Sequence, residues 1–352
     1  MAAAAAAADG AATSPEATET RYLALMATAF VTGGTGFVGL NVIDQLLLGG
    51  HRVVALHRPT SDVRRLKERK VELAVGAITD RASLDKAIPD ACDFVFHIAG
   101  NTSTWSGDRD VQTRDNVDGT RNVVDAALAK KVKRMVHTSS VAAYGAHENA
   151  PIDESAPQRG KESPVNYERT KCLAEEEVRA GIARGLDAVI LNPGHVIGRF
   201  DAHNWARSFL MVHKGRLPGI PPGVGSFADG DEVAKAHVTA LTKGRTGENY
   251  FLGGIDATYV EMFAIIGRLL GKKVPTKAAP LWLLSVAASV MQFGSTFTGR
   301  APDFTPELVY LLKHPLTIKS DKAVRELDYK IVPLETMLTK CHEWLRAEGL
   351  LG

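Results

Sequence analysis

Near its beginning the sequence reads Val31-Thr32-Gly33-Gly34-Thr35-Gly36-Phe37-Val38-Gly39, with three of its glycines spaced three residues apart. A short apolar run over 27–31 precedes this stretch, and a helical apolar pattern over 38–47 follows it. Strand, tight glycine turn and helix in this order hold the pyrophosphate of a dinucleotide, because the helix N-terminus offers free N–H groups and a positive dipole end. Gly33 suits the tight turn, Gly36 the close approach of a phosphate, and Gly39 close packing of the helix. Three glycines also fit a bare loop, but their position between a strand pattern and a helix pattern favours a nucleotide site.

Composition excludes several other classes of protein. The chain has 352 residues, enough for one large domain or two modest ones. Its 42 Lys and Arg residues nearly balance its 40 Asp and Glu residues, which gives no support for nucleic acid as the main partner. Cys92, Cys172 and Cys341 are far apart and lack the spacing of a metal site. We therefore expect reduced thiols, a cytoplasmic protein and no bound metal.

Two segments differ in composition from the rest of the chain. Residues 1–25 form a low-complexity tail rich in Ala, Thr, Glu and Gly, which we expect to be disordered and which lacks the features of a secretory signal. The strongest apolar run covers 281–293 and is too short to span a bilayer, which takes about 20 residues. We interpret it as a buried or half-buried helix. The alternative is a helix that covers an apolar substrate or touches a membrane surface.

Strand-like and helix-like segments alternate through the first half of the chain. The expected strands are 27–31, 52–56, 71–75, 93–98, 134–138 and 187–191. The expected helices between them are 38–47, 61–69, 81–88, 114–129 and 164–183. Strict alternation predicts an α/β fold, a Rossmann-type doubly wound parallel sheet whose strand-end loops lie along one edge.

The pattern changes after residue 194. We expect helices over 232–242, 259–270, 281–293, 306–312 and 334–348, and a strand near 249–254 that returns to the sheet. The sequence therefore predicts a nucleotide-binding domain over 26–194. A smaller, mostly helical part over 195–352 is expected to bind the substrate.

A phenol and an ammonium stand four residues apart in the expected helix 164–183. Tyr167 and Lys171 at this spacing share one helix face. A nearby ammonium favours phenolate and lowers the pKa of the Tyr, so that it can exchange a proton with a carbonyl or alcohol oxygen. Taken alone the pair also fits a solvated helix face, but the upstream glycine turn favours a catalytic pair.

Two serines, Ser139 and Ser140, stand at the end of the expected strand 134–138. A hydroxyl at this position would hydrogen-bond the substrate oxygen beside the Tyr. The alternative is a pair of turn-forming serines.

Together these motifs resemble the extended short-chain dehydrogenase/reductase superfamily, in its branch of NAD-dependent epimerases/dehydratases and dihydroflavonol-4-reductases. The matching segments are 32–39, Phe96-His97-Ile98-Ala99-Gly100, Asn116-Val117-Asp118-Gly119-Thr120, Ser139 to Gly145, Tyr167 with Lys171, 192–198, and 320–329. The resemblance spans roughly residues 27–350.

The resemblance implies a role for each matching residue. Tyr167 would be the general acid/base, Lys171 would lower its pKa and bind the nicotinamide ribose, and Ser140, with Ser139 as runner-up, would orient the substrate oxygen. The cofactor would contact Gly33, Thr35, Gly36, Phe37, Val38, Arg58, Ile78, Ala99, Gly100, Pro193 and Val196. Asn116 fits a structural role as well as a functional one. Homodimerisation through two helices is a family expectation.

The chain departs from the family pattern at two places. Ala77 follows Gly76 where the family often has Asp, so one polar contact to adenine is lost although Ile78 remains. Asp328 stands where the family prefers Gly, which we expect to be harmless.

The residues after the second expected strand bear on the choice of cofactor. An acid there would bind the ribose 2′-OH of NAD, whereas a base would accept the 2′-phosphate of NADP. The chain has Arg58 and no acid before Asp62, which favours NADP over NAD. The alternative is a solvated Arg, with NAD tolerated.

Candidates for substrate contact are Asn101, Ser103, Thr104 and Trp105 after one strand and His195 after another. Apolar segments around 210–224 and 281–293 favour an apolar carbonyl compound or alcohol over a nucleotide sugar. We therefore expect an NADP-dependent oxidoreductase. The alternatives are an NAD-dependent nucleotide-sugar epimerase/dehydratase and a non-catalytic NADP-binding sensor.

Overall fold

The computed structural model describes residues 27–148, 151–302 and 304–351. Its main sheet has seven parallel strands in the order β3-β2-β1-β4-β5-β6-β9. The strands are β1 (Thr28–Thr32), β2 (Arg52–His57), β3 (Glu72–Val75), β4 (Phe94–His97), β5 (Arg134–Thr138), β6 (Ala188–Pro193) and β9 (Asn249–Leu252). This order confirms the doubly wound α/β fold and places the ends of the strands along one edge. The tail 1–25 lies outside the described residues.

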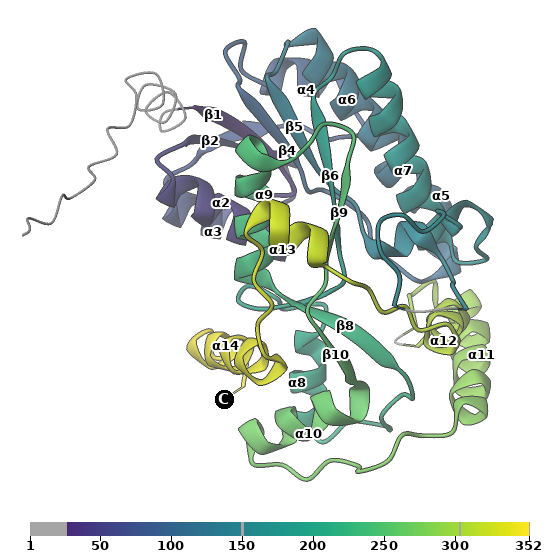
Figure 1. The fold of residues 1–352 in the computed structure, drawn as a ribbon. Helices are drawn as coiled ribbons and strands as arrows, with labels where there is room; N and C mark the ends of the chain where they lie inside the picture. The colour runs from purple at the N-terminus through teal and green to yellow at the C-terminus, as the bar shows by residue number, and fades with distance from the viewer. Residues whose placement is uncertain (1–26, 149–150, 303, 352) are drawn as a thin grey trace, which may run out of the picture.

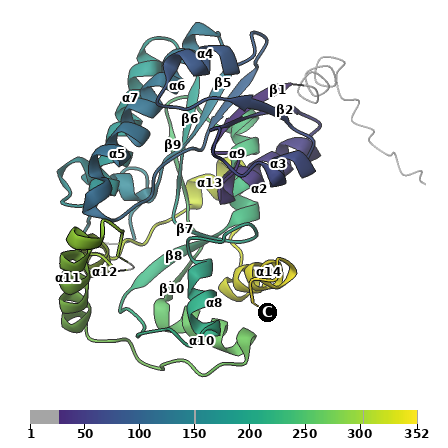
Figure 2. The same ribbon diagram turned by 180° about the vertical axis from the view of Figure 1, so that it is seen from behind.

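Helices cover both faces of the sheet (Figures 1 and 2). One face carries α2 (Phe37–Leu48), α3 (Arg64–Glu68) and α9 (Gly230–Lys243), and the other carries α4 (Arg81–Ala87), α6 (Gly119–Ala129) and α7 (Asn166–Ala183). Successive strand residues point to opposite faces, so in β5 Val136 joins the first core and Met135 the second. Both faces are therefore apolar, as expected of strands in a parallel sheet.

The helix predicted over 114–129 is interrupted. α5 (Arg109–Thr113) runs into a π-helical turn (Arg114–Asp118) before α6 begins. Asn116 in this turn is buried, and its Nδ2 donates to the Asn101 carbonyl at 2.9 Å and to Thr170 Oγ1 at 3.0 Å. Its Oδ1 accepts the Asn101 N–H at 2.7 Å. The wider π-helical turn points this amide toward the interior. The periodicity of apolar residues in the sequence does not indicate such a turn.

The C-terminal part contains a second sheet that the sequence analysis did not predict. Strands β7 (His195–Ile197), β8 (Val224–Asp229) and β10 (Ile255–Thr258) form it in the order β10-β8-β7. Helices α8 (Ala206–His213), α10 (Tyr259–Leu270) and α14 (Leu334–Ala347) share an apolar core with it. The expectation of a mostly helical part is correct for its helices but omits this sheet.

The remaining helices lie around these two sheets. α11 (Leu281–Thr298) packs on α12 (Pro306–Lys313), and α13 (Asp321–Leu327) packs on α9 and β9. α11 runs five residues beyond the predicted end at Phe293, and β6 continues through Asn192 and Pro193, where a stop was predicted. Within the described ranges no helix is long and apolar enough to cross a bilayer.

Candidate active site

The glycine turn between β1 and α2 tolerates no side chain at two of its positions. Gly33 has a φ of +74°, and a Cβ there would lie 2.6 Å from the backbone nitrogen of Ala99. A Cβ on Gly39 would lie 2.1 Å from the Gly33 carbonyl oxygen. Both distances are too short for any side chain, so the turn requires glycine at these positions.

The first turn of α2 has open N–H groups. Its N-cap, Gly36, provides no side-chain cap, and the first turn carries no acidic residue. Thr35 and Gly36 are exposed, so a ligand can reach the backbone there. An uncapped helix N-terminus with a glycine turn before it fits the pyrophosphate of a dinucleotide, because both N–H groups and the helix dipole attract anions.

A buried histidine ties the loop after β4 to this turn. Thr32 Oγ1 lies 2.8 Å from His97 Nδ1, and His97 Nε2 lies 2.9 Å from Thr120 Oγ1. Thr32 Oγ1 also accepts the Ala99 N–H at 3.2 Å. Burial lowers the pKa of His97 to about 3, so the ring is neutral and acts as a fixed hydrogen-bonding spacer. The chain at Ala99 and Gly100 is thereby held beside the glycine turn.

The other predicted cofactor contacts also lie near strand ends. Arg58 follows β2 and is exposed. Ile78 follows β3, and the Ile78 carbonyl accepts a hydrogen bond from Asn122 Nδ2 at 2.9 Å. The ring of Phe37 lies against Gly230, and Val38 packs on the core beneath α2. Pro193 ends β6 and Val196 lies in β7. These cofactor roles stay predictions. Arg58, Ile78 and Pro193 lie at the carboxyl ends of strands of the main sheet, whereas Val196 lies in the second sheet.

Tyr167, Ser140 and Lys171 come together at the start of α7. Tyr167 is half-buried and makes a side-chain hydrogen bond with Ser140, whose Oγ also accepts the Ala142 N–H at 3.2 Å. Lys171 is buried, and its Nζ donates to the Thr138 carbonyl at 3.1 Å. A Cβ on Gly100 would lie 3.3 Å from this Nζ, so the ammonium lies against the loop after β4.

The pKa values differ from the sequence expectation. We expected the ammonium to lower the pKa of Tyr167, but burial raises it, and the bond with Ser140 opposes that rise. Burial also lowers the pKa of Lys171 to about 8, against the attraction of the Glu175 carboxylate. Desolvation therefore sets the direction of both shifts, and Tyr167 is a protonated phenol at neutral pH.

The neighbouring Ser139 has a different partner. It is 4% exposed, and its Oγ donates to Glu175 Oε1 at 2.5 Å. Its hydroxyl is thus engaged away from Tyr167. Of the two serines, Ser140 is the one that contacts the phenol.

Glu175 is a feature that sequence analysis did not identify. Its side chain is fully buried, and Oε1 accepts from Ser139 and from Asn192 Nδ2 at 2.6 Å. Oε2 accepts from Gln158 Nε2 at 2.5 Å and from Asn249 Nδ2 at 2.8 Å. Four donors on two oxygens require an unprotonated carboxylate. We call this group the Glu175 cluster.

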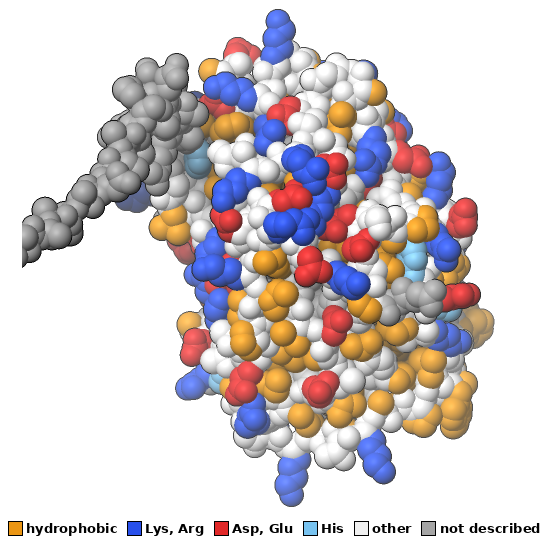
Figure 3. Space-filling view, viewed as in Figure 1, with side chains coloured by type: hydrophobic (Ala, Val, Ile, Leu, Met, Phe, Trp, Pro, Cys, Tyr) orange, Lys and Arg blue, Asp and Glu red, His pale blue; other side chains and the backbone are white. Residues whose placement is uncertain are grey.

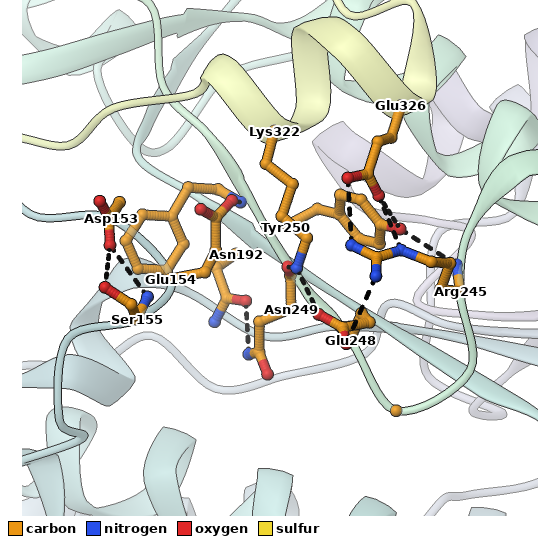
Figure 4. Close-up of polar contacts among 12 residues, drawn as sticks. Asp153, Glu154, Ser155, Asn192, Arg245, Glu248, Asn249, Tyr250, Lys322 and Glu326 are labelled. Atoms are coloured by element: carbon orange, nitrogen blue, oxygen red, sulfur yellow. Dashed lines mark hydrogen bonds and ion pairs between the residues drawn. The ribbon is translucent and has the colours of Figure 1, made fainter.

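The Glu175 cluster fixes the ends of three strands. Asn192 Nδ2 donates to the Ser140 carbonyl at 3.0 Å, and its Oδ1 accepts from Asn249 Nδ2 at 2.8 Å. Figure 4 shows Asn192 and Asn249 facing each other, with Glu248 and Lys322 close by. A cavity of about 730 Å³ opens beside Asn249 and Lys322, and neither Tyr167, Lys171 nor Ser140 lines it. The Glu175 cluster therefore holds the backbone of Ser140 in place, because the Asn192 amide contacts both Glu175 and the Ser140 carbonyl.

Two of the candidate substrate residues, Ser103 and His195, have distinct surroundings. Ser103 Oγ donates to Asp108 at 2.6 Å and accepts the Trp105 N–H at 3.2 Å, so its hydroxyl is used within its own loop. His195 lies among aromatic rings, with centroid distances of 4.8 Å to Trp205 and 5.6 Å to Phe227. Burial lowers the pKa of His195 to about 4. The first residue of β7 thus places a neutral ring in an aromatic cluster.

Two further observations concern metals and cysteines. Within the described ranges, no group of three or more His, Cys, Asp or Glu side chains is placed to hold a metal ion. Cys92, Cys172 and Cys341 are buried free thiols.

Comparison with known proteins places these features in context. The model of the NAD dependent epimerase/dehydratase family matches residues 29–253. The sterol demethylase protein B of Methylococcus capsulatus is 31% identical over 92% of this chain and 100% of its own length. A Stigmatella aurantiaca protein is 30% identical over 85% of this chain and 91% of its own, and its name is 4-hydroxy-2-methyl-3-oxo-4-farnesyl-3,4-dihydroquinoline-1-oxide ketoreductase.

A solved structure shows the same architecture. The crystal structure of gox2253 is similar with a TM-score of 0.80 and 32% identity, over 92% of this chain and 98% of that one. Both sheets and the helices around them thus fall within an aligned region that covers nearly the whole chain.

Proposed function

The chain belongs to the NAD dependent epimerase/dehydratase family and is an NAD(P)-binding oxidoreductase, and from this premise we propose that it reduces ketones or aldehydes of apolar compounds with NADPH, or oxidises the corresponding alcohols. The observation that carries the proposal is the contact between Tyr167 and Ser140, with Lys171 against Gly100. Two hydroxyls that meet at one point can both reach a single substrate oxygen.

The catalytic step follows from these side chains. When bound, the reduced nicotinamide supplies a hydride, which carries two electrons to the carbonyl carbon. Ser140 holds the carbonyl oxygen, and Tyr167 Oη transfers its proton to that oxygen as the negative charge develops. The raised pKa of Tyr167 keeps this proton in place until the step begins. Lys171 then stabilises the phenolate that forms, because its ammonium lies on the same face of α7.

The preference for NADP rests on Arg58. This exposed side chain follows β2, the strand next to the glycine turn. A guanidinium there would bind the 2′-phosphate through charge-assisted hydrogen bonds. Arg58→Ala should raise the Michaelis constant for NADPH by about tenfold, equivalent to about 1.4 kcal/mol, and leave that for NADH unchanged. Arg64→Ala removes another exposed Arg nearby and is the matched control.

The side chains around His195, the first residue of β7, favour an apolar substrate. His195 is neutral and half-buried, and it packs against the half-buried Trp205 and the buried Phe227, so this part of the molecule carries aromatic rather than charged side chains. A nucleotide sugar carries a diphosphate that such a surface would bind poorly. The name of the Stigmatella relative, a ketoreductase of a farnesylated compound, also supports an apolar carbonyl substrate.

The decisive experiment combines cofactor identification with turnover. Mass spectrometry of the denatured protein identifies any copurified cofactor, and NADPH oxidation is then followed over a panel of apolar and polar carbonyl compounds. Tyr167→Phe should abolish turnover and leave NADPH binding intact, because it removes only the proton donor. Retention of most activity by this variant would refute the assignment. Release of tightly held NAD, without NADPH oxidation on any carbonyl, would instead favour an epimerase.

A further inference from the structure

The helix α11 exposes its largest apolar side chains. Trp282 is 68% exposed and Phe297 is 78% exposed, at opposite ends of the helix. With 3.6 residues per turn, positions 282, 286, 290, 293 and 297 lie along one side. We call this side the outer face of α11. It consists of Trp282, Leu283, Val286, Val290, Phe293 and Phe297, all exposed.

The opposite side of α11 faces the protein with fewer large apolar side chains. Leu281 and Leu284 are half-buried on this side, and Leu281 packs on the core of the C-terminal part. Ala288 and Ser295 are buried there, and Gln292 Nε2 donates to Ser106 Oγ at 3.1 Å. A surface helix of a globular protein shows the reverse arrangement, with its apolar side inward. The outer face of α11 therefore suits an apolar medium rather than water. Exposed apolar patches of this kind mark interaction surfaces.

The position of α11 leaves its outer face accessible. In two opposite views the helix stands at the outer edge of the molecule, with α12 beside it (Figures 1 and 2). Figure 3 shows apolar side chains gathered along the edge where Figure 1 places α11. The contact of Gln292 with Ser106 also joins α11 to the loop after β4, which the sequence analysis selected for substrate contact.

The exposed charged residues on either side of α11 in the sequence are bases, and Glu307 of the neighbouring α12 is buried and paired with Arg109. The helix itself contains no charged residue, and the sequence has no Asp or Glu between Glu261 and Asp303. Lys277 precedes the helix and Arg300 follows it, and both are exposed, as are Lys272 and Lys273. Aromatic and aliphatic side chains on one side, flanked by bases, are typical of a helix that lies in the interface of an anionic membrane.

We propose that the outer face of α11 docks on a membrane surface that contains anionic phospholipid. The helix has 18 residues and would lie flat, with its apolar side chains among the acyl chains and with Lys277 and Arg300 among the headgroups. A second copy of the chain fits this face less well. Two copies that met symmetrically through it would bring bases of the same sign together.

Vesicle sedimentation with the full-length protein tests the proposal. The protein should bind vesicles of phosphatidylcholine with phosphatidylserine, bind vesicles of pure phosphatidylcholine less, and lose binding as salt screens the charges. The double variant Trp282→Ser with Phe297→Ser should weaken binding by at least about tenfold, since each large apolar side chain contributes on the order of the 1.4 kcal/mol that a factor of ten represents. Lys277→Glu with Arg300→Glu should abolish the preference for phosphatidylserine.

The control removes exposed apolar side chains elsewhere. Leu48 is 80% exposed and Val75 is 60% exposed, on α2 and β3. Leu48→Ser with Val75→Ser should bind phosphatidylserine vesicles as the parent protein does, and all variants should keep the parent's unfolding temperature. The proposal is overturned if the parent protein fails to bind, or if the Trp282 and Phe297 variant binds equally well. It is also overturned if light scattering shows a dimer that this variant dissociates while neither protein binds vesicles.

Discussion

Replacing Glu175 by Gln keeps the shape of the side chain and removes its charge. In the Glu175 cluster two carboxylate oxygens accept from four donors, on Ser139, Asn192, Gln158 and Asn249. An amide has a single acceptor oxygen and an NH₂ group that only donates. The substitution therefore creates at least one contact between two donors, whichever way the amide turns.

The magnitude follows from the fixed partners. Asn192 cannot turn, because its Nδ2 also donates to the Ser140 carbonyl and its Oδ1 accepts from Asn249. One buried donor is then left without an acceptor, at about 1–3 kcal/mol, and the remaining bonds lose their charge assistance at roughly 1 kcal/mol in total. We expect Glu175→Gln to lower the free energy of unfolding by about 3 kcal/mol, a large part of the stability of a typical protein.

The same substitution should change the pH dependence of catalysis. The Glu175 carboxylate raises the pKa of Lys171, whereas burial lowers it. Replacing this carboxylate by a neutral amide therefore lowers the pKa of Lys171 below about 8. The ammonium is then lost at lower pH, and the alkaline limb of kcat/KM should move to lower pH. A merely structural defect would reduce the rate without moving this limb.

Urea denaturation at neutral pH and a pH–rate profile measure both effects. Glu176→Gln is the matched control, because the neighbouring Glu176 forms an exposed ion pair with Lys161 and should change stability by less than about 0.5 kcal/mol. The reasoning would be refuted if Glu175→Gln were as stable as the parent protein, or if the Glu176 control were equally destabilised.

Three further substitutions test other parts of the structure. Gly39→Ala should destabilise the protein by about 3 kcal/mol and abolish dinucleotide binding, because the added Cβ would lie 2.1 Å from the Gly33 carbonyl oxygen. A cofactor titration that showed normal affinity would contradict this. Asp328→Gly should stabilise the protein by about 0.5 kcal/mol. Asp328 has a φ of +54°, which strains a residue with a side chain, and its exposed ion pair with Lys243 offsets only part of this strain. A lower unfolding temperature of the variant would count against this reasoning. The pKa of Lys171 is about 8 in the folded protein, below its ordinary value of 10.5. The unfolded state therefore binds this proton more tightly, and the free energy of unfolding rises with pH between these two values by roughly 3 kcal/mol. Lys171→Met should lack this rise in denaturation curves of the cofactor-free protein, and an unchanged pH dependence would argue against the burial of this ammonium.

Features with a local cause were predictable from the sequence. β5 and α10 have the predicted bounds, and β9 (Asn249–Leu252) lies within the predicted 249–254, because buried apolar runs and helical periodicity mark them directly. The glycine turn was predictable since Gly33 and Gly39 each meet a neighbour that excludes a side chain. The spacing of Tyr167 and Lys171 likewise expresses the period of one helix.

Features that depend on distant partners were not predictable. β7 has three residues, and its pairing with β8 joins segments about thirty residues apart, so no local pattern indicates it. Glu175 begins a run of three glutamates that reads as a solvated helix face, and only the packed strands reveal that the first of them is buried. The raised pKa of Tyr167 also comes from burial, which sequence spacing does not report.

The last strand of the main sheet has a consequence for how the protein is made. β9 pairs with β6, although Leu252 lies 59 residues beyond Pro193 in the chain. During synthesis the whole segment through β9 must therefore leave the ribosome before β6 gains its second neighbouring strand and Glu175 gains the hydrogen bond from Asn249. A fragment that ends at residue 194 would present a bare strand edge and an incompletely satisfied carboxylate. The nucleotide-binding half of this protein thus matures only after most of its chain has been translated.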